Sequence, residues 1–210
     1  MSGRFITFEG GEGCGKSTQV RLLKETLELS GIEVTLTREP GGTRLAELVR
    51  GLLKDELEDP PCDRAELLLF LAARAQLVRN VIRPALAAGK WVLSDRFSDS
   101  TFAYQGYGRG LPLGDVRRLN DFACEGLTSD LTLLLKVDAG TAARRMRARE
   151  AATATAADRI ELAGDGFHAR LARGFECLAA AEPERIVTID ANGSVEEVRE
   201  AVWKSVSRFL

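Results

Sequence analysis

The amino-acid sequence predicts a three-layer α/β fold in which a parallel sheet of about five strands lies between helices. Short apolar runs, rich in β-branched and aromatic residues, alternate with longer amphipathic stretches along the whole chain. The apolar runs lack the strict alternation of a half-exposed strand, a pattern typical of strands buried on both faces of a sheet. Such alternation of strands and helices favours a parallel sheet with helices on both faces.

Each element is expected where the pattern changes. The strands are expected at residues 5–8, 34–37, 91–94, 131–137 and 186–189. The helices are expected at residues 16–29, 44–53, 64–88, 116–124, 141–150, 167–181 and 195–209. Because no repeat or linker divides the chain, residues 1–210 are expected to form a single domain, large enough to bury a core without disulfides.

The charge balance argues against two classes of binding protein. The chain has 29 Lys and Arg against 31 Asp and Glu, a formal net charge of −2. We therefore expect neither a nucleic-acid coat protein nor a polybasic membrane binder. Hydrophobic residues at 45% and charged residues at 29% are typical of globular proteins and exclude a disordered or collagen-like chain.

The cysteines and the apolar segments indicate a cytoplasmic protein. Cys14, Cys62, Cys124 and Cys177 are scattered and form no C-x-x-C motif, so we expect free thiols in a reducing compartment. The start of the chain has no apolar stretch long enough for a signal peptide. The most apolar window, residues 67–73, is far shorter than the roughly 20 residues that span a bilayer.

The first predicted strand leads into a phosphate-binding loop. Residues 10–17, GGEGCGKS, satisfy the pattern G-x-x-x-x-G-K-[ST] and precede a predicted helix. Glycines let backbone N–H groups point into one concavity, and the helix N-terminus favours an anion there. Lys16 is expected to reach the β- and γ-phosphates, and Ser17 to ligate Mg²⁺. The alternative is a glycine-rich turn without a ligand. The residues expected to bind ATP here are Gly10, Gly11, Glu12, Gly13, Cys14, Gly15, Lys16, Ser17 and Thr18.

Two residues near this loop admit two interpretations each. Asp95 follows the apolar run of residues 91–94, at the sheet edge where α/β proteins bind ligands. It is a candidate to hold Mg²⁺ through water, or else a structural carboxylate that holds Arg96. Cys14 is either a thiol activated by the helix N-terminus or the occupant of a variable loop position.

Four motifs occur together in one order. They are FEGGEGCGKST at residues 8–18, TREPGGT at 37–43, LAARAQL at 71–77 and DRFSDSTFAYQG at 95–106. With them, the chain resembles bacterial thymidylate kinases along nearly its whole length. The resemblance implies a P-loop NTPase fold, transfer of the ATP γ-phosphate to dTMP with Mg²⁺ to give dTDP, and a homodimer packed through helices. It also implies a short lid at about residues 147–164, into which the DRIE segment at 158–161 fits.

Phe70 and Arg74 are the candidate residues for recognising the base. They are four residues apart on a predicted helix and therefore lie on one face, an aromatic plate beside a fork of donors. The resemblance implies that Phe70 stacks on thymine and that Arg74 contacts an exocyclic oxygen of the base. Taken alone, Phe70 is equally compatible with simple core packing. An unpaired buried arginine is costly, so Arg74 is harder to explain in that way.

Two arginines are candidate clamps for the substrate monophosphate. The guanidinium groups of Arg38 and Arg96 suit phosphate oxygens because two parallel N–H bonds form at once. The alternative for either is a surface ion pair, for example between Arg38 and Glu39. The resemblance also implies that the turn at Pro40 shapes the substrate pocket.

The remaining substrate residues come from the resemblance. Ser100 and Gln105 are expected beside the base, and Tyr104 beneath the sugar, where a ribose 2′-hydroxyl would be crowded. Glu9 is expected near the sugar hydroxyl and the metal ion.

The chemistry needs no general base. The only histidine, His168, is expected to be a solvated helix residue. A nucleoside monophosphate is mostly ionised at neutral pH, so positioning and charge neutralisation are sufficient. Lys16, Mg²⁺ and lid arginines are expected to neutralise the charge. The variable positions of the phosphate loop hold no arginine, which by resemblance makes a lid arginine the catalytic one. The candidates are Arg144, Arg145, Arg147, Arg149 and Arg159.

Within the lid, Arg159 is the first choice for catalysis and Arg145 is expected beside ATP. At least two of the other arginines are expected on a solvated helix face. The Ala- and Thr-rich residues 151–157 are either a mobile flap or a tolerated surface insertion.

Two other function classes stay open at this point. One is another nucleoside monophosphate kinase or a deoxynucleoside kinase, against which Phe70, Arg74 and the motif at 95–106 argue. The other is a regulatory NTPase, for which a guanine-reading N-K-x-D motif would be expected in a GTPase and is absent from the sequence.

Overall fold

The computed structural model describes residues 3–55, 58–153 and 164–210. Its centre is a parallel sheet of five strands, as the sequence predicted, and the strand order is β2-β3-β1-β4-β5. The strands are β1 (Phe5–Glu9), β2 (Val34–Arg38), β3 (Trp91–Asp95), β4 (Leu131–Lys136) and β5 (Ile186–Asp190).

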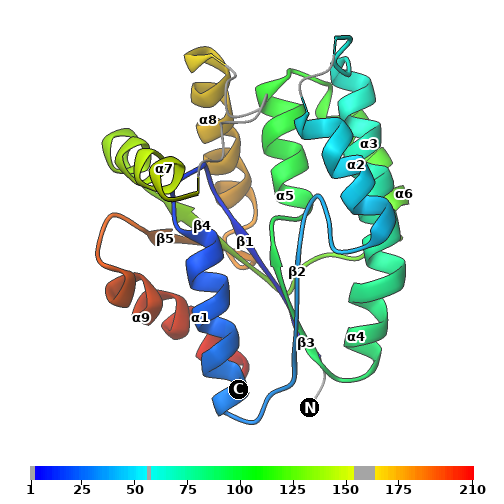
Figure 1. Cartoon of the computed structure of the whole chain (residues 1–210). Helices are drawn as coiled ribbons and strands as arrows, with labels where there is room; N and C mark the ends of the chain where they lie inside the picture. Colours follow the sequence, from blue (N-terminus) through cyan, green and yellow to red (C-terminus); the bar gives the residue numbers. More distant parts are fainter. Residues whose placement is uncertain (1–2, 56–57, 154–163) are drawn as a thin grey trace.

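Helices cover both faces of this sheet (Figure 1). On one face lie α1 (Lys16–Leu29) and α9 (Val195–Val206), which pack against each other. The other face carries the remaining helices, α7 excepted. These elements are α2 (Arg44–Lys54), α3 (Asp63–Leu77), α4 (Arg83–Ala87), α5 (Ser98–Thr101), α6 (Leu113–Cys124) and α8 (Asp165–Ala181).

The central strand β1 contributes to a core on each side. Ile6 and Phe8 belong to the cluster beneath α1 and α9, whereas Phe5 belongs to the cluster beneath α3 and α4. All three side chains are at most 1% exposed, and burial of each contributes about 2 kcal/mol. Two covered faces explain why the apolar runs of the sequence do not alternate with polar residues.

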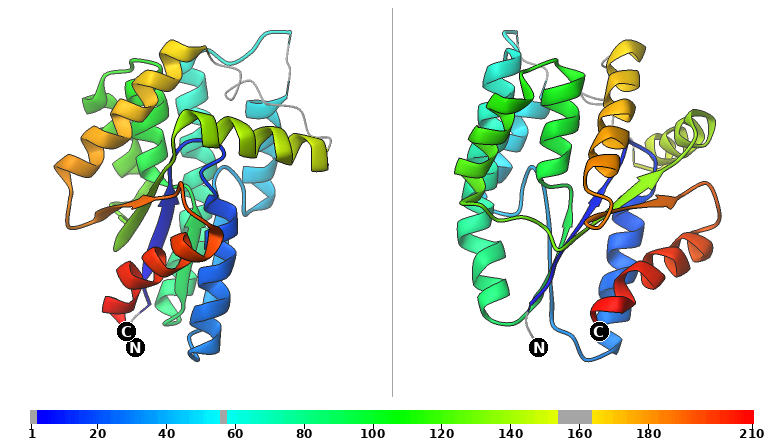
Figure 2. Two further views of the ribbon diagram at one scale, coloured as in Figure 1. Left: turned by 90° about the vertical axis from the view of Figure 1, so that its left-hand side faces the viewer. Right: turned by 180° about the vertical axis from the view of Figure 1, so that it is seen from behind.

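The strand register brings polar residues to one edge of the sheet. Phe8 and Arg38 are both aligned with Asp95, and Glu9 is aligned with Leu134. Helix α7 (Ala139–Thr153) lies across this end of the molecule, while both chain termini lie at the opposite end (Figure 2). The carboxyl ends of the strands and α7 therefore surround the region where the sequence motifs predict a site.

Two helical predictions need correction. The helix predicted at residues 64–88 is interrupted by a π-helical turn, Val78–Ile82, between α3 and α4. The segment after β3, in which no helix was predicted, forms α5 and continues as a second π-helical stretch, Phe102–Gly108. That segment contains aromatic and glycine residues with poor helix propensity, so its shape depends on tertiary contacts. Within the described ranges, no helix is long and apolar enough to cross a membrane.

Candidate active site

The phosphate loop depends on glycines at two close approaches. Gly10 has φ 134° and Gly13 has φ 70°, which L side chains rarely adopt. A Cβ atom on Gly10 would lie 2.4 Å from the Leu135 carbonyl oxygen, and one on Gly13 would lie 2.6 Å from the Ala142 carbonyl oxygen. The loop therefore packs closely against the end of β4 and the start of α7.

Lys16 lies inside this loop. Its side chain is buried, and Nζ donates hydrogen bonds to the carbonyl oxygens of Gly10 (3.2 Å) and Gly11 (2.8 Å). Burial lowers the pKa of this ammonium group, but the negative groups around it, Glu12 and Asp95 among them, outweigh burial and raise it. Lys16 is therefore a fixed positive charge at the start of α1.

Ser17 and Asp95 meet where the first turn of α1 faces the end of β3. Ser17 Oγ donates a hydrogen bond of 2.8 Å to Asp95 Oδ2. Two hard oxygen donors beside a phosphate loop fit Mg²⁺, which takes few protein ligands and keeps waters and substrate phosphates. The described residues contain no larger cluster of metal-binding side chains. Because Asp95 is bonded to Ser17 of the phosphate loop, the structure favours a metal-site role for Asp95 over a purely structural one.

Glu9 is a buried carboxyl that joins β1 to the start of α5. Its Oε1 accepts hydrogen bonds from the backbone N–H groups of Phe97 (2.8 Å) and Ser100 (3.1 Å). Its Oε2 accepts one from Ser100 Oγ (2.6 Å). Burial, reinforced by the nearby Asp99 carboxylate, raises the pKa of Glu9 to about 7. Glu9 supports the cavity floor without being among its lining residues.

Arg96 connects the phosphate loop to the segment that follows β3. Its backbone φ of 73° is unusual for a residue other than glycine, and such strain is common where an active site over-determines a residue. The guanidinium donates to the carbonyl oxygen of Gly10 (3.0 Å) and to Ser100 Oγ (3.1 Å), and it pairs with Glu12. It also lies 5.0 Å from the ring centre of Tyr104.

Glu12 is an anion held among cations. Burial would raise the pKa of its carboxyl, but Arg96, Lys16 and Arg149 outweigh that effect and lower the pKa to about 2. Arg149 Nη1 lies 3.6 Å from Glu12 Oε2. This carboxylate therefore links the phosphate loop to Arg96 and to α7.

These residues surround a cavity of about 600 Å³, a size suited to small ligands. Most of the predicted site residues line it: Glu12, Gly13, Cys14, Gly15, Lys16, Ser17, Thr18, Arg38, Pro40, Phe70, Arg74, Asp95, Arg96, Ser100, Tyr104, Gln105 and Arg145. Gly10 and Gly11 lie beside it and bond Lys16 through their carbonyl groups. Arg159 lies outside the described residues.

Arg74 is more extensively bonded than the sequence indicates. Its side chain is 1% exposed, and its N–H groups donate to Glu39, Thr101, Asn120 and the carbonyl oxygen of Phe97. Together these bonds use all five N–H groups, because Nε and Nη2 both bond Glu39. Contact with a base oxygen therefore requires Arg74 to share or exchange one of them.

The other substrate-side candidates differ in burial and in partners. Phe70 is half-buried; it lines the cavity and also packs on the small core between α2 and α3. Arg38 is exposed and pairs with Glu47 on α2 (3.0 Å), so the alternative pairing with Glu39 is wrong. Gln105 is 1% exposed, and its Nε2 donates to Glu66 Oε1 (3.0 Å).

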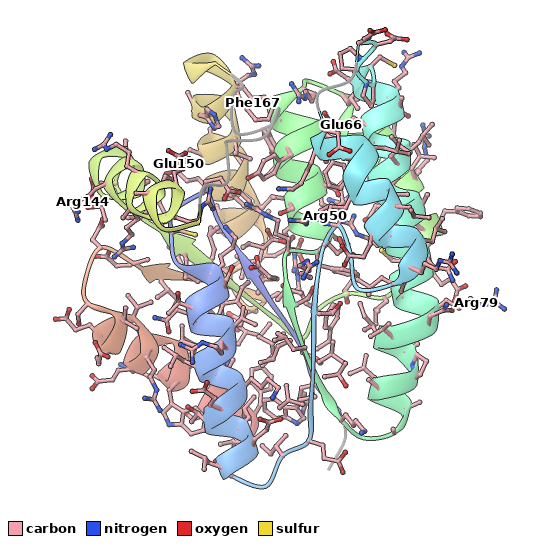
Figure 3. The ribbon with its side chains drawn as sticks, in the orientation of Figure 1. Arg50, Glu66, Arg79, Arg144, Glu150 and Phe167 are labelled. Carbon is pink, nitrogen blue, oxygen red and sulfur yellow. The ribbon has the colours of Figure 1, made fainter. Side chains whose placement is uncertain are left out.

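The arginines of α7 divide into two groups. Arg145 donates to the carbonyl oxygens of Ala191 (2.8 Å) and Gly193 (3.2 Å), and both Arg145 and Arg149 line the cavity. Arg144 and Arg147 are exposed, and Arg144 points away from the molecule (Figure 3). The expected solvated face is therefore present on this helix.

Sequence reasoning missed several lining residues. His168 is half-buried and lines the cavity, where a solvated residue was expected. Arg50 reaches toward the centre from α2 (Figure 3) and donates to the carbonyl oxygen of Pro40 (2.8 Å). Glu39 also lines the cavity, and its place in the TREPGGT motif at residues 37–43 could have identified it. Gly193, Ser194 and Val195 belong to no motif, so only the fold brings them to the site.

Replacing Glu9 by Gln is expected to flatten the pH dependence of stability between about pH 4.5 and 7. Because the folded protein binds this proton more tightly (pKa about 7) than the unfolded chain does (4.5), the wild-type free energy of unfolding falls as pH rises through this window. Each unit of pKa difference corresponds to about 1.4 kcal/mol. Urea unfolding of both proteins at about pH 5 and about pH 8 measures the change. An equal fall in both proteins contradicts the role of burial at Glu9.

The comparisons with known proteins agree with this geometry. A family model described as thymidylate kinase matches residues 8–202. The chain is 46% identical to a thymidylate kinase of Trichormus variabilis over 100% of this chain and 98% of that protein. It is 49% identical to one of Solidesulfovibrio magneticus, over 98% of this chain and 100% of that protein.

A solved structure is also similar. The crystal structure of thymidylate kinase from Ehrlichia chaffeensis matches with a TM-score of 0.79 and 34% identity, covering 99% of this chain and 100% of the other. A phosphate loop facing a deep cavity, a full-length match in sequence and a full-length match in fold lead to one conclusion: the chain belongs to the thymidylate kinase family.

Proposed function

We propose that the cavity is where this thymidylate kinase converts dTMP to dTDP, with ATP as the phosphoryl donor and Mg²⁺ as the metal ion. One observation carries the proposal. The phosphate loop with its Ser17–Asp95 pair and the pocket of Phe70, Arg74 and Gln105 open into the same space of about 600 Å³. Donor and acceptor phosphates would therefore meet inside one cavity.

The ATP side consists of the loop, the start of α1 and the loop after β5. Backbone N–H groups of residues 10–18 would cradle the phosphates, and Lys16 would lie against the β- and γ-phosphates. Ser17 would hold Mg²⁺ directly and Asp95 through water. Bound there, the ion would neutralise negative charge on the phosphates. Arg145, bonded to the loop after β5, would lie beside the adenosine.

The dTMP side consists of β2, α3 and the segment after β3. Arg96 and Arg38 would clamp the monophosphate, since guanidinium forks match phosphate oxygens. Phe70 would stack on the base while Arg74 and Gln105 face its edge. Ser100 would lie beside the base, and Tyr104 and Pro40 would shape the pocket. Glu9 does not line the cavity, so it would act near the sugar hydroxyl through the lining residues that it bonds, such as Ser100.

Transfer at this site depends on positioning and charge. The acceptor oxygen of dTMP is already ionised near neutral pH, so no side chain has to remove a proton. Lys16 and Arg96 hold positive charge on both sides of the position where the phosphoryl group would move. A lid arginine at about residues 147–164 would complete the neutralisation, with Arg159 as the first choice.

Lys16→Ala is expected to lower kcat by about 10²-fold or more without unfolding the protein, because a preorganised charge at the moving phosphoryl group is lost. Lys24→Ala, on the same helix in an exposed pair with Glu28, is the control and should keep wild-type activity. A coupled assay of ADP formation with and without dTMP measures both. Full activity of Lys16→Ala, or ADP formation that needs no dTMP, excludes the proposed mechanism.

Arg159→Ala is expected to lower kcat by about 10³-fold while the KM for ATP changes little, since a lid arginine stabilises charge that develops during transfer. Arg147→Ala, at an exposed position of α7, is the matched control. Steady-state kinetics distinguish Arg159 from Arg149. If Arg159→Ala turns over normally and Arg149→Ala does not, the role belongs to Arg149.

The proposal includes a homodimer formed through α3 and α6. These neighbouring helices expose Leu68 (55%), Leu119 (39%) and Phe122 (86%). A shallow groove of about 320 Å³ between them is lined by Leu67, Leu68 and Leu119. Apolar side chains gathered on adjacent helices are typical of a surface that a second chain covers.

Phe122→Glu is expected to raise the dimer dissociation constant at least tenfold, because the charge would be buried at the interface. Leu29→Glu changes a side chain of equal exposure (87%) at the end of α1 and should leave association unchanged. Sedimentation equilibrium of the three proteins measures the constants. Equal association of all three places the interface elsewhere.

A cytoplasmic location is part of the proposal. All four cysteines, Cys14, Cys62, Cys124 and Cys177, are free thiols, and Cys14 and Cys124 are buried. Free thiols of this kind persist in a reducing compartment.

A further inference from the structure

A buried carboxylate, Glu66, bonds the side-chain amide of Gln105, which lines the cavity. We propose that Glu66, held by Arg109, is a positioning residue that fixes the side-chain amide of Gln105 so that its oxygen faces the base, and thereby restricts the site to pyrimidines that carry a proton on N3. The inference rests on the proposed function, because it concerns the nucleotide that accepts the phosphoryl group. It adds a residue that determines which base is accepted and that lies behind the cavity lining.

Three side chains, those of Gln105, Glu66 and Arg109, form one hydrogen-bonded group. Gln105 Nε2 donates a hydrogen bond of 3.0 Å to Glu66 Oε1. Arg109 grips the same carboxylate with two bonds, from Nε to Oε1 (3.1 Å) and from Nη2 to Oε2 (2.9 Å). Glu66 and Gln105 are each 1% exposed, so solvent does not compete for these bonds.

The carboxylate allows one orientation of the amide. An ionised carboxylate has only acceptor atoms, whereas the amide of Gln105 has one donor end and one acceptor end. Turning the amide by 180° would place Gln105 Oε1 against Glu66 Oε1, with no proton between them. A buried pair of unmatched acceptors costs far more than an exposed one, so the amide stays as observed.

The backbone and Arg109 are also fixed. The N–H group of Leu111 donates to the Gln105 carbonyl oxygen (3.1 Å), and the N–H group of Arg109 donates to the Tyr104 carbonyl oxygen (2.9 Å). The guanidinium of Arg109 lies 4.7 Å from the ring centre of Phe167. Gln105 therefore has little freedom to turn within its π-helical stretch.

The two residues that hold the Gln105 amide lie behind the cavity lining. Gln105 lines the cavity, whereas Glu66 and Arg109 do not. Figure 3 shows Glu66 near the upper end of α3, whereas Arg79, just beyond the end of that helix, points outward into solvent. Because Nε2 is directed at a residue behind the lining, Oε1 is the amide atom left for a ligand.

An acceptor on the cavity lining at this position selects one class of base. Thymine and uracil carry N3–H, a donor that Gln105 Oε1 can accept. Cytosine presents a lone pair at N3 and an amino group at C4, so its N3 would meet Oε1 acceptor to acceptor. Arg74 favours the same class, since its N–H groups suit a carbonyl at C4 rather than an amino group. A site built around such hydrogen bonds rejects a mismatched ligand strongly, because buried polar groups are left unpaired.

The test compares kcat/KM for dTMP, dUMP and dCMP in the wild type and in Glu66→Gln. A neutral side chain at position 66 can accept from Gln105 or donate to it, so the amide is free to turn. We expect the dTMP/dCMP ratio to fall at least tenfold in Glu66→Gln. The dTMP/dUMP ratio should stay within twofold of wild type, because both bases carry N3–H.

Two further variants complete the design. Arg109→Lys keeps the positive charge but cannot hold both carboxylate oxygens, and it should lower the dTMP/dCMP ratio at least threefold. Arg185→Ala is the matched control: it removes another partly buried arginine that holds a buried carboxylate, that of Asp99, without touching Gln105. It should lower the melting temperature and leave both ratios unchanged.

The outcomes separate the inference from the function on which it rests. If Glu66→Gln and Arg109→Lys lower kcat/KM for all three nucleotides by one common factor, Glu66 is a structural residue only and the inference is overturned. If the wild type fails to phosphorylate dTMP, the proposed function itself is overturned. Thermal unfolding of each variant shows that the ratios come from folded protein.

Discussion

The buried carboxyl of Glu9 is the contact on which the site depends. Glu9 ends the central strand and accepts N–H bonds from Phe97 and Ser100. It thereby anchors the start of a segment whose aromatic and glycine residues do not favour a helix on their own. Everything that the segment carries, from Ser100 to Gln105, takes its position relative to the phosphate loop from that anchor. One strand end therefore positions this segment against the phosphate loop.

Charge is concentrated at this point in a chain that is nearly neutral overall. Lys16, Arg96 and Arg149 converge on the carboxylate of Glu12, which burial alone would neutralise and which these cations keep ionised. The negative charge of Glu12 offsets the repulsion that these cations would otherwise exert on one another.

The side of the cavity that Arg74 and Gln105 line depends on a different principle, the complete bonding of buried polar groups. Arg74 has partners for all five N–H groups, and Glu66 is held by Arg109 and by Gln105. Buried ion pairs contribute little net stability compared with apolar packing. Their value at this site is orientation, because each fully bonded group leaves its neighbours one allowed geometry.

The sequence by itself determined the five parallel strands and the phosphate loop, because periodicity and glycine spacing are local properties. The candidate residues outside that loop came mainly from the resemblance of four motifs to a known family. The sequence could not determine the helical stretch that carries Gln105, the cavity position of His168, or which partner holds Arg38. Those features depend on pairs far apart in the chain, such as Ser17 with Asp95, separated by 78 residues, and Gln105 with Glu66, separated by 39. Only the folded sheet and its helices bring such residues together, and burial then decides which of their hydrogen bonds must form.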